Sequence, residues 1–377
     1  MEAKAETASG PIDFERAPFE QYFVREGDAL VDSTVESHKP PSFHVARQCA
    51  SVCCGCFSEE PCFTRALKAF LHLSFANAGA YVGGTFDREK FNFEQQVKAG
   101  PNRKREVNVE DFVVLRDDGS ERNVRVFTPF TLRNSEAGSA PVLLYTHGGG
   151  FVLGDPRTSN IAWFCTELAH HLQAIVVAPS YRLSPEFPFP VPVEDAYSSF
   201  VWLVSDEARE KIPAMDLSRT ILIGESAGGN LTQVIATLYR DGVQADLKTP
   251  AVPELERIKV VAVAPLFPLF FFAKKTKASA ARDKGLLADF MGDFFVVSYL
   301  PDVQDEEMRL KYVNDLRINP LAGPKGASGL PLVVLMSGGK DPLHGDASIL
   351  EQACKEAGVP VEHYFDPKGI HTFHLMP

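Results

Sequence analysis

The residue pattern best suited to chemistry is the pentapeptide GESAG at 224–228, with Ser226 at its centre. It lies between an apolar run at 220–224 and a helix-like stretch at 228–240. In a Gly-x-Ser-x-Gly elbow, the serine occupies a strained turn between a strand and a helix, and its hydroxyl is exposed at the carboxyl edge of the sheet. Glycines lack a Cβ, so the strand and the helix can crowd around that turn. The pattern predicts that Ser226 is the nucleophile of an acyl-transfer reaction.

A second pattern, HGGGF at 147–151, follows another apolar run and precedes the serine. Three consecutive glycines leave backbone N–H groups free to point at an oxygen, with no side chain in the way. Acyl transfer needs such donors where the tetrahedral oxyanion develops. The predicted oxyanion-hole donors are the N–H groups of Gly148, Gly149 and Ala227. His147 and Gly150 are expected to organise the loop rather than to act as acid or base.

The elements that must position these motifs alternate along the chain. An antiparallel pair is expected at 112–115 and 124–127. Continuous Val, Ile and Leu runs are typical of strands covered on both faces, and they lie at 141–146, 174–179, 220–224, 259–264 and 331–337. Helices are expected between them, at 159–172, 193–209, 228–240 and 346–357. This alternation predicts an α/β fold with a mostly parallel, doubly wound sheet.

Composition limits the class of protein. The chain has 377 residues, 45% of them hydrophobic and 23% charged, which is typical of a globular protein. Its formal net charge of −11 argues against a nucleic-acid binder. The longest apolar run, 260–273, contains two prolines and is too short to span a bilayer. The first 16 residues lack the apolar core of a secretory signal, so a cytoplasmic location is expected.

Together with the segment YRLSPE at 181–186, the two glycine motifs make the sequence similar to the hormone-sensitive-lipase-like family of α/β-hydrolases. That family includes bacterial esterases, arylacetamide deacetylases and plant carboxylesterases, and the resemblance covers about residues 105–377. It implies an α/β-hydrolase fold with a sheet of about eight strands and a helical cap. It also implies a structural role, in a buried network, for Arg182, Glu186 and Asp195.

In that family the acid and the histidine follow the serine in chain order. Asp341 comes just after the apolar run at 331–337 and is the predicted acid. Its rival is Asp346, which is otherwise expected to cap a helix. The sequence His-Thr-Phe at 371–373 resembles the family's His-x-Phe ending, so His371 is the predicted base. His374 is the alternative, otherwise expected as a solvated residue, and His344 and His363 are expected on the surface or in a strand.

The resemblance implies a carboxylic-ester hydrolase with a Ser-Asp-His triad that requires no cofactor or metal. The predicted domains are an N-terminal arm and helical cap segment at 1–100, a core at 101–267, a cap insertion at 268–318 and a second core segment at 319–377. The insertion begins LFPLFFFAKKTK from residue 266. Its aromatic residues favour a small-molecule ester with an apolar acyl or aryl group, and Phe151, Phe270 and Phe271 are the predicted pocket residues.

Two features leave alternatives open. The aromatic run followed by lysines fits either ordinary cap packing or an acyl pocket whose basic rim touches a membrane or a lipid droplet. Five cysteines, Cys49, Cys53, Cys54, Cys56 and Cys62, have a spacing that fits no common zinc pattern. Reduced thiols, S-acylation as a peripheral membrane anchor, and metal binding are the three interpretations.

Two other functions are compatible with the same fold. One is a non-catalytic small-molecule receptor, as in the plant gibberellin receptors that resemble this family and have lost the catalytic histidine. The presence of His371 favours the enzyme. The other is an amide or formamide hydrolase, because the triad does not set the leaving group.

Overall fold

The structure is a computed structural model, and it describes residues 106–375 apart from 117, 244–252, 271–294, 301 and 304. Predictions for the N-terminal arm, for the cysteine cluster and for most of the aromatic run after residue 270 therefore lie outside the described residues. None of the described helices is both long and apolar enough to cross a membrane.

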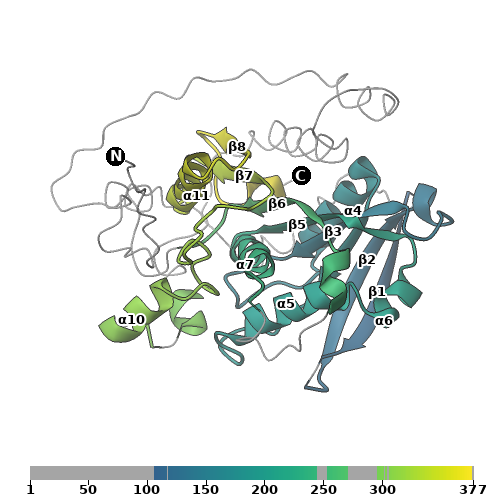
Figure 1. The fold of residues 1–377 in the computed structure, drawn as a ribbon, viewed down its shortest axis with the longest axis horizontal. Coiled ribbons are helices and arrows are strands. Elements are labelled where there is room, and N and C mark those ends of the chain that lie inside the picture. Colours follow the sequence, from purple (N-terminus) through teal and green to yellow (C-terminus); the bar gives the residue numbers. More distant parts are fainter. Residues whose placement is uncertain are drawn as a thin grey trace, which may run out of the picture.

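One eight-stranded sheet organises the described residues, with the strand order β1-β2-β4-β3-β5-β6-β7-β8 (Figure 1). The pairs β1–β2 and β2–β4 are antiparallel, and all other pairs are parallel. The predicted α/β-hydrolase fold with about eight strands is confirmed. The strands are β1 Val107–Leu115, β2 Glu121–Pro129, β3 Ala140–Thr146, β4 Ile175–Pro179, β5 Met215–Glu225, β6 Val260–Leu266, β7 Leu332–Gly338 and β8 Val361–Asp366.

The helices cover both faces of this sheet. The apolar side chains of α4 pack with the C-terminal residues Phe373 and Leu375 in one core cluster, whereas those of α5, α7 and α11 belong to the cluster on the other face. The helices are α4 Ser159–Leu172, α5 Val191–Trp202, α6 Asp206–Lys211, α7 Ala227–Asp241, α10 Glu306–Val313 and α11 His344–Glu356, with short 3-10 turns at Phe130–Leu132, Pro253–Arg257 and Phe373–Leu375.

The single helix predicted at 193–209 is two helices. α5 ends at Trp202, and Ser205 then caps α6 because its side chain accepts a hydrogen bond from the N–H of Ala208. A serine can satisfy a free N–H group at the start of a helix, so it favours a new start over continuation.

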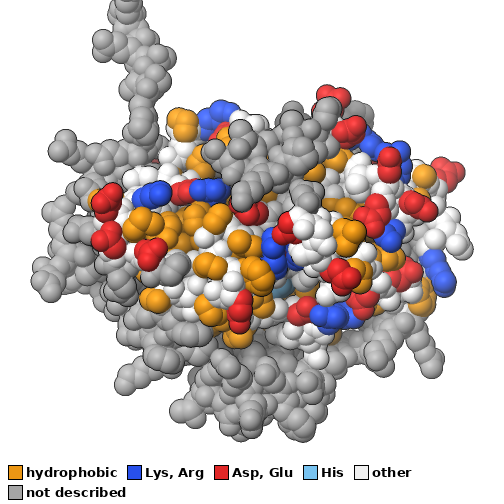
Figure 2. Space-filling model, turned by 90° about the horizontal axis from the view of Figure 1, so that it is seen from below, with side chains coloured by type: hydrophobic (Ala, Val, Ile, Leu, Met, Phe, Trp, Pro, Cys, Tyr) orange, Lys and Arg blue, Asp and Glu red, His pale blue; other side chains and the backbone are white. Residues whose placement is uncertain are grey.

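Part of the predicted cap insertion is described, namely α10 and a short helical segment at 295–299. On the face drawn in Figure 2, apolar side chains gather over the middle, and acidic and basic side chains are interspersed around them.

Candidate active site

The nucleophile elbow has the strained geometry that its motif predicts. Ser226 stands between the end of β5 and the start of α7, with a φ of 57° and a ψ of −121°. A residue other than glycine rarely adopts a positive φ, and such strain persists only where the surrounding structure enforces it. Here the enforcing element is β3, because a Cβ on Gly224 or on Gly228 would overlap the carbonyl oxygen of Thr146. The two glycines therefore allow β3 to pass close beside the turn.

Ser226, His371 and Asp341 form one continuous chain of contacts. The Nε2 atom of His371 lies 2.9 Å from the Oγ atom of Ser226, and its Nδ1 atom lies 2.9 Å from Oδ2 of Asp341. All three residues are buried, with exposed fractions of 8%, 5% and 2%. With Asp341 as a carboxylate, Nδ1 carries the imidazole proton and Nε2 is left as an acceptor facing the serine. This arrangement can remove the proton from Ser226.

Three loops at the carboxyl ends of parallel strands bring these side chains together. Ser226 follows β5 and Asp341 follows β7, while His371 lies in the loop after β8. The second carboxylate oxygen of Asp341 accepts a hydrogen bond from the N–H of Leu343 at 2.8 Å. This contact fixes the carboxyl group against rotation.

Asp346, the rival acid, lies elsewhere. It is the third residue of α11, it is buried, and its Oδ2 atom accepts the N–H of Phe270 at 2.8 Å. The expectation that it caps the helix is wrong, since α11 already begins at His344. Its carboxyl group instead fastens α11 to the segment that follows β6.

The prediction for residues 147–151, called the oxyanion loop from here on, needs one correction. The N–H of Gly148 donates to the Oε1 atom of Glu225 at 2.6 Å, so it is not available to an oxyanion. The N–H groups of Gly149 and Gly150 donate to no acceptor among the described residues. Ala227 is the first residue of α7, where an N–H has no partner within its own helix. The available donors are therefore those of Gly149, Gly150 and Ala227.

His147 is held within its own loop. Its Nδ1 atom lies 2.8 Å from the carbonyl oxygen of Gly148, and its ring stacks on Tyr181 at a centroid distance of 4.2 Å. The hydroxyl of Tyr181 also donates to the carbonyl oxygen of His147 at 2.8 Å. Burial lowers the pKa of His147 to about 4, so the ring is neutral at pH 7.

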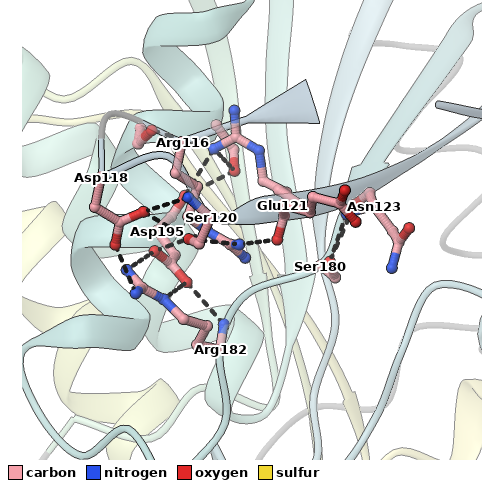
Figure 3. A network of polar contacts seen from close by, with 11 residues as sticks. Arg116, Asp118, Ser120, Glu121, Asn123, Ser180, Arg182 and Asp195 are labelled. Carbon is pink, nitrogen blue, oxygen red and sulfur yellow. Dashed lines mark hydrogen bonds and ion pairs between the residues drawn. The ribbon is translucent and has the colours of Figure 1, made fainter. Parts of the chain in front are cut away.

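A polar network surrounds Asp195 (Figure 3). Arg182 donates to both oxygens of Asp195, at 2.9 and 2.8 Å, and to Asp118 at 2.8 Å, while the Nε atom of Arg116 lies 3.1 Å from Asp195. These contacts join the loop after β4 to α5 and to the β1–β2 turn. The predicted network role of Glu186 is wrong, because that residue is exposed and no contact joins it to Arg182 or Asp195.

The aromatic residues predicted to line a pocket are only partly described. Phe151 is buried and stacks on Tyr299 with ring centroids 3.8 Å apart. Phe270 is buried as well, and Phe271 lies outside the described residues. Phe295 was not among the predicted pocket residues, and its ring packs directly against Gly150 in the oxyanion loop. The sequence carries no signal for that contact, because Phe295 lies in an apolar helical stretch and nothing distinguishes it there from its apolar neighbours.

His374 is not the solvated residue that was expected. It is 2% exposed, its ring stacks on Phe267, and its edge meets Phe164 at a centroid distance of 4.7 Å. Burial lowers its pKa to about 3. The structure brings His371, and not His374, into contact with the serine.

Two other histidines form a separate network on β7, β8 and α11. The hydroxyl of Ser337 lies 2.9 Å from Nδ1 of His344 and 2.7 Å from Nε2 of His363, and Nδ1 of His363 lies 2.7 Å from Glu351. Among the residues that the structure describes, no group of three or more His, Cys, Asp or Glu side chains is arranged to hold a metal ion.

Comparison with known proteins gives consistent matches. A protein-family model described as an alpha/beta hydrolase fold matches residues 143–375. The chain is 30% identical to carboxylesterase NlhH of Mycobacterium tuberculosis over 290 residues, which span 74% of this chain and 79% of that protein. It is 32% identical to the carboxylic ester hydrolase LipN of the same organism over 242 residues, which span 64% of this chain and 59% of LipN.

Among solved structures, a hyperthermophilic esterase from Pyrobaculum calidifontis superposes with a TM-score of 0.62 at 26% identity. The superposition covers 77% of this chain and 87% of the esterase.

Proposed function

Because the chain belongs to the hormone-sensitive-lipase-like family of α/β-hydrolases, we propose that it is a serine carboxylesterase. The observation that carries the proposal is the chain of contacts from Asp341 through His371 to Ser226, in which both distances are 2.9 Å. The names of the relatives, carboxylesterase and carboxylic ester hydrolase, support the same reaction.

The residues then act in the following order. His371 takes the proton of the Ser226 hydroxyl as its oxygen attacks the ester carbonyl carbon, and Asp341 holds the imidazolium that forms. The N–H groups of Gly149, Gly150 and Ala227 stabilise the oxyanion. His371 gives its proton to the departing alcohol, which leaves an acyl group on Ser226. Water attacks this ester with His371 again as the base, and the carboxylic acid is released.

The proposed substrate is an ester with an apolar acyl or aryl group of short to medium length. The oxyanion loop is bounded by aromatic rings, since Phe295 packs against Gly150 and Phe151 stacks on Tyr299. Such surroundings exclude water and favour apolar groups over charged ones.

The first test is hydrolysis of p-nitrophenyl esters from acetate to palmitate by the wild type, Ser226→Ala and Ser218→Ala. Ser218 is a matched control, because it lies on the same strand and is exposed. We expect Ser226→Ala to lower kcat by at least about 10³-fold and Ser218→Ala to retain wild-type activity. With a short-chain ester, the wild type should also gain the mass of one acyl group, and Ser226→Ala should not.

Equal activity in the wild type and in Ser226→Ala would refute the proposal. A wild type that binds esters without turning any over would favour the receptor. Faster turnover of anilides than of the matched esters would favour the amide hydrolase.

A further inference from the structure

A second carboxyl group lies next to the nucleophile, outside the proposed triad. Glu225 is the last residue of β5 and precedes Ser226 directly, and it is 1% exposed. Its Oε1 atom accepts the N–H of Gly148 at 2.6 Å, and its Oε2 atom accepts the hydroxyl of Tyr145 at 2.5 Å. The carboxyl group therefore connects the nucleophile elbow to the loop that carries the free N–H groups.

The elbow and the loop touch closely at this point. A Cβ built on Gly148 would lie 2.9 Å from the carbonyl oxygen of Glu225, 3.1 Å from its Oε1 atom and 3.2 Å from the Cβ of Ser226. Any larger residue at 148 would push the loop away from the serine. The loop is thus held against the elbow by a close backbone approach and by one hydrogen bond to a side chain.

Among the residues that the structure describes, no positive charge compensates this carboxyl group. The titratable groups that face it are Tyr145 on β3, Cys165 on α4 and Tyr181 after β4. His147, in the loop itself, is neutral because burial lowers its pKa to about 4. Burial raises the pKa of Glu225 to about 7, although the hydrogen bonds from Tyr145 and Gly148 act in the opposite direction. A carboxyl group with no cation beside it is a costly way to fill a core position.

We propose that Glu225 is a positioning residue of the esterase, whose carboxylate holds the N–H of Gly148 and so directs the N–H groups of Gly149 and Gly150 towards the oxyanion. This inference rests on the proposed function. The peptide plane before Gly148 is fixed by its bond to Oε1, and Gly149 and Gly150 follow with φ values of 112° and 63°. Successive N–H groups in such conformations form a concave site for a negative oxygen.

The proposal requires that the carboxylate holds the loop better than the neutral acid does. A hydrogen bond to an ionised acceptor is roughly twice as strong as one between neutral groups. Protonation of Oε2 would also force the Tyr145 hydroxyl to turn away. Maximal activity therefore requires the deprotonated form of Glu225.

Three variants separate the carboxylate's charge from its geometry. Glu225→Gln keeps an oxygen for the N–H of Gly148 and an amide donor for Tyr145. Glu225→Leu removes the acceptor. Tyr145→Phe is the matched control, because it removes the other hydrogen bond to the same carboxyl group and leaves the contact with Gly148. We expect Glu225→Leu to lower kcat about 10²-fold with little change in KM, since the N–H groups act on the transition state. Glu225→Gln should recover most of that loss.

The pH profile distinguishes positioning from mere packing. The acid limb of log(kcat/KM) should show an additional inflection near pH 7 in the wild type, from titration of Glu225, and this inflection should be absent in Glu225→Gln. In the wild type, the hydrogen bond from Tyr145 favours the carboxylate form of Glu225. Its loss in Tyr145→Phe should raise the pKa of Glu225 and so move the acid limb to higher pH. That shift should be absent when Tyr145→Phe is combined with Glu225→Gln. Thermal unfolding of each variant shows whether it is folded.

Wild-type kcat in a folded Glu225→Leu would overturn the inference, and so would equal pH profiles in the wild type and in Glu225→Gln. If Glu225→Leu does not fold, the profiles of Tyr145→Phe and of the double variant decide. These outcomes leave the proposed function intact as long as activity depends on Ser226. Loss of that dependence would instead refute the proposed function.

Discussion

The buried carboxyl group of Glu225 should leave a measurable mark on stability as well as on activity. Its pKa rises from 4.5 to about 7 on folding, so the folded state binds the proton more tightly than the unfolded state. The stability that this group contributes is therefore present below pH 4.5 and is lost as the pH rises through 7. A rise of between two and three pKa units corresponds to about 3 kcal/mol at 1.36 kcal/mol per unit.

The perturbation that reveals this effect is Glu225→Gln, because the amide has nearly the same shape and does not titrate. The free energy of unfolding of both proteins is measured by urea denaturation from pH 4.5 to pH 8, with fluorescence of the two tryptophans, Trp163 and Trp202, as the signal. Other titrating groups are common to both proteins and cancel in the difference. From pH 4.5 to pH 8, the free energy of unfolding of the variant should rise by about 3 kcal/mol relative to that of the wild type.

A difference that stays constant to within about 1 kcal/mol across that range would refute the reasoning. It would mean that water reaches the carboxyl group in the folded protein. If Glu225→Gln is more stable than the wild type at pH 8 but less active, the carboxylate of Glu225 lowers the stability of the wild type and raises its activity.

Three further predictions concern the neighbouring residues. Asp341→Asn should lower kcat at pH 7 by about 10⁴-fold without lowering the melting temperature by a comparable amount, because the amide no longer holds the histidine tautomer. Gly150→Ala should abolish activity, because position 150 has a φ of 63° and the added Cβ would overlap the ring of Phe295; adding Phe295→Ala should restore part of it. His374→Leu should raise the melting temperature at pH 4 more than at pH 7. The pKa of His374 falls from 6.5 to about 3 on folding, so the wild type loses stability as the pH falls below 6.5.

Each of these predictions can fail in its own way. Near-normal turnover by Asp341→Asn would remove that residue from the proposed mechanism. Equal inactivity of the single and double Gly150 variants would show that backbone strain, and not the Phe295 ring, is decisive. If the effect of His374→Leu did not depend on pH, folding would not lower the pKa of His374.

Much of the fold follows from the sequence because parallel strands are buried on both faces. Their continuous apolar runs predicted the ends of β3, β4, β6 and β7 to within a few residues. The start of β5 was predicted less well, because this strand begins at Met215 and not at 220. The first antiparallel strand was predicted too short, at 112–115. Its first half, from Val107, contains the polar residues Asn108, Glu110 and Asp111, so it lacks the apolar pattern of a strand. These residues are nevertheless paired with β2, in an edge strand that is partly exposed.

The three proposed triad residues could be located from the sequence because each follows a strand at the same edge of the sheet. The proposed oxyanion donors could not be located in this way, because every glycine at 148–150 offers an N–H and only the fold shows that the N–H of Gly148 is already bound. Similarly, the position of His374 near the end of the sequence suggested exposure, whereas the rings of Phe164 and Phe267 enclose it.

The role of Glu225, in contrast, had a signal that the motif concealed. Side chains alternate between the two faces of a strand, and Ile221 and Ile223 on β5 pack on the α4 face, whereas Leu222 packs on the opposite face. Glu225 continues the odd-numbered series, so its side chain must enter the same buried layer. Tyr145 does so in the same way, two residues after Leu143 on β3. The second position of a Gly-x-Ser-x-Gly elbow is therefore a buried strand position, and a carboxyl group there requires hydrogen-bond donors from the adjacent strand and loop.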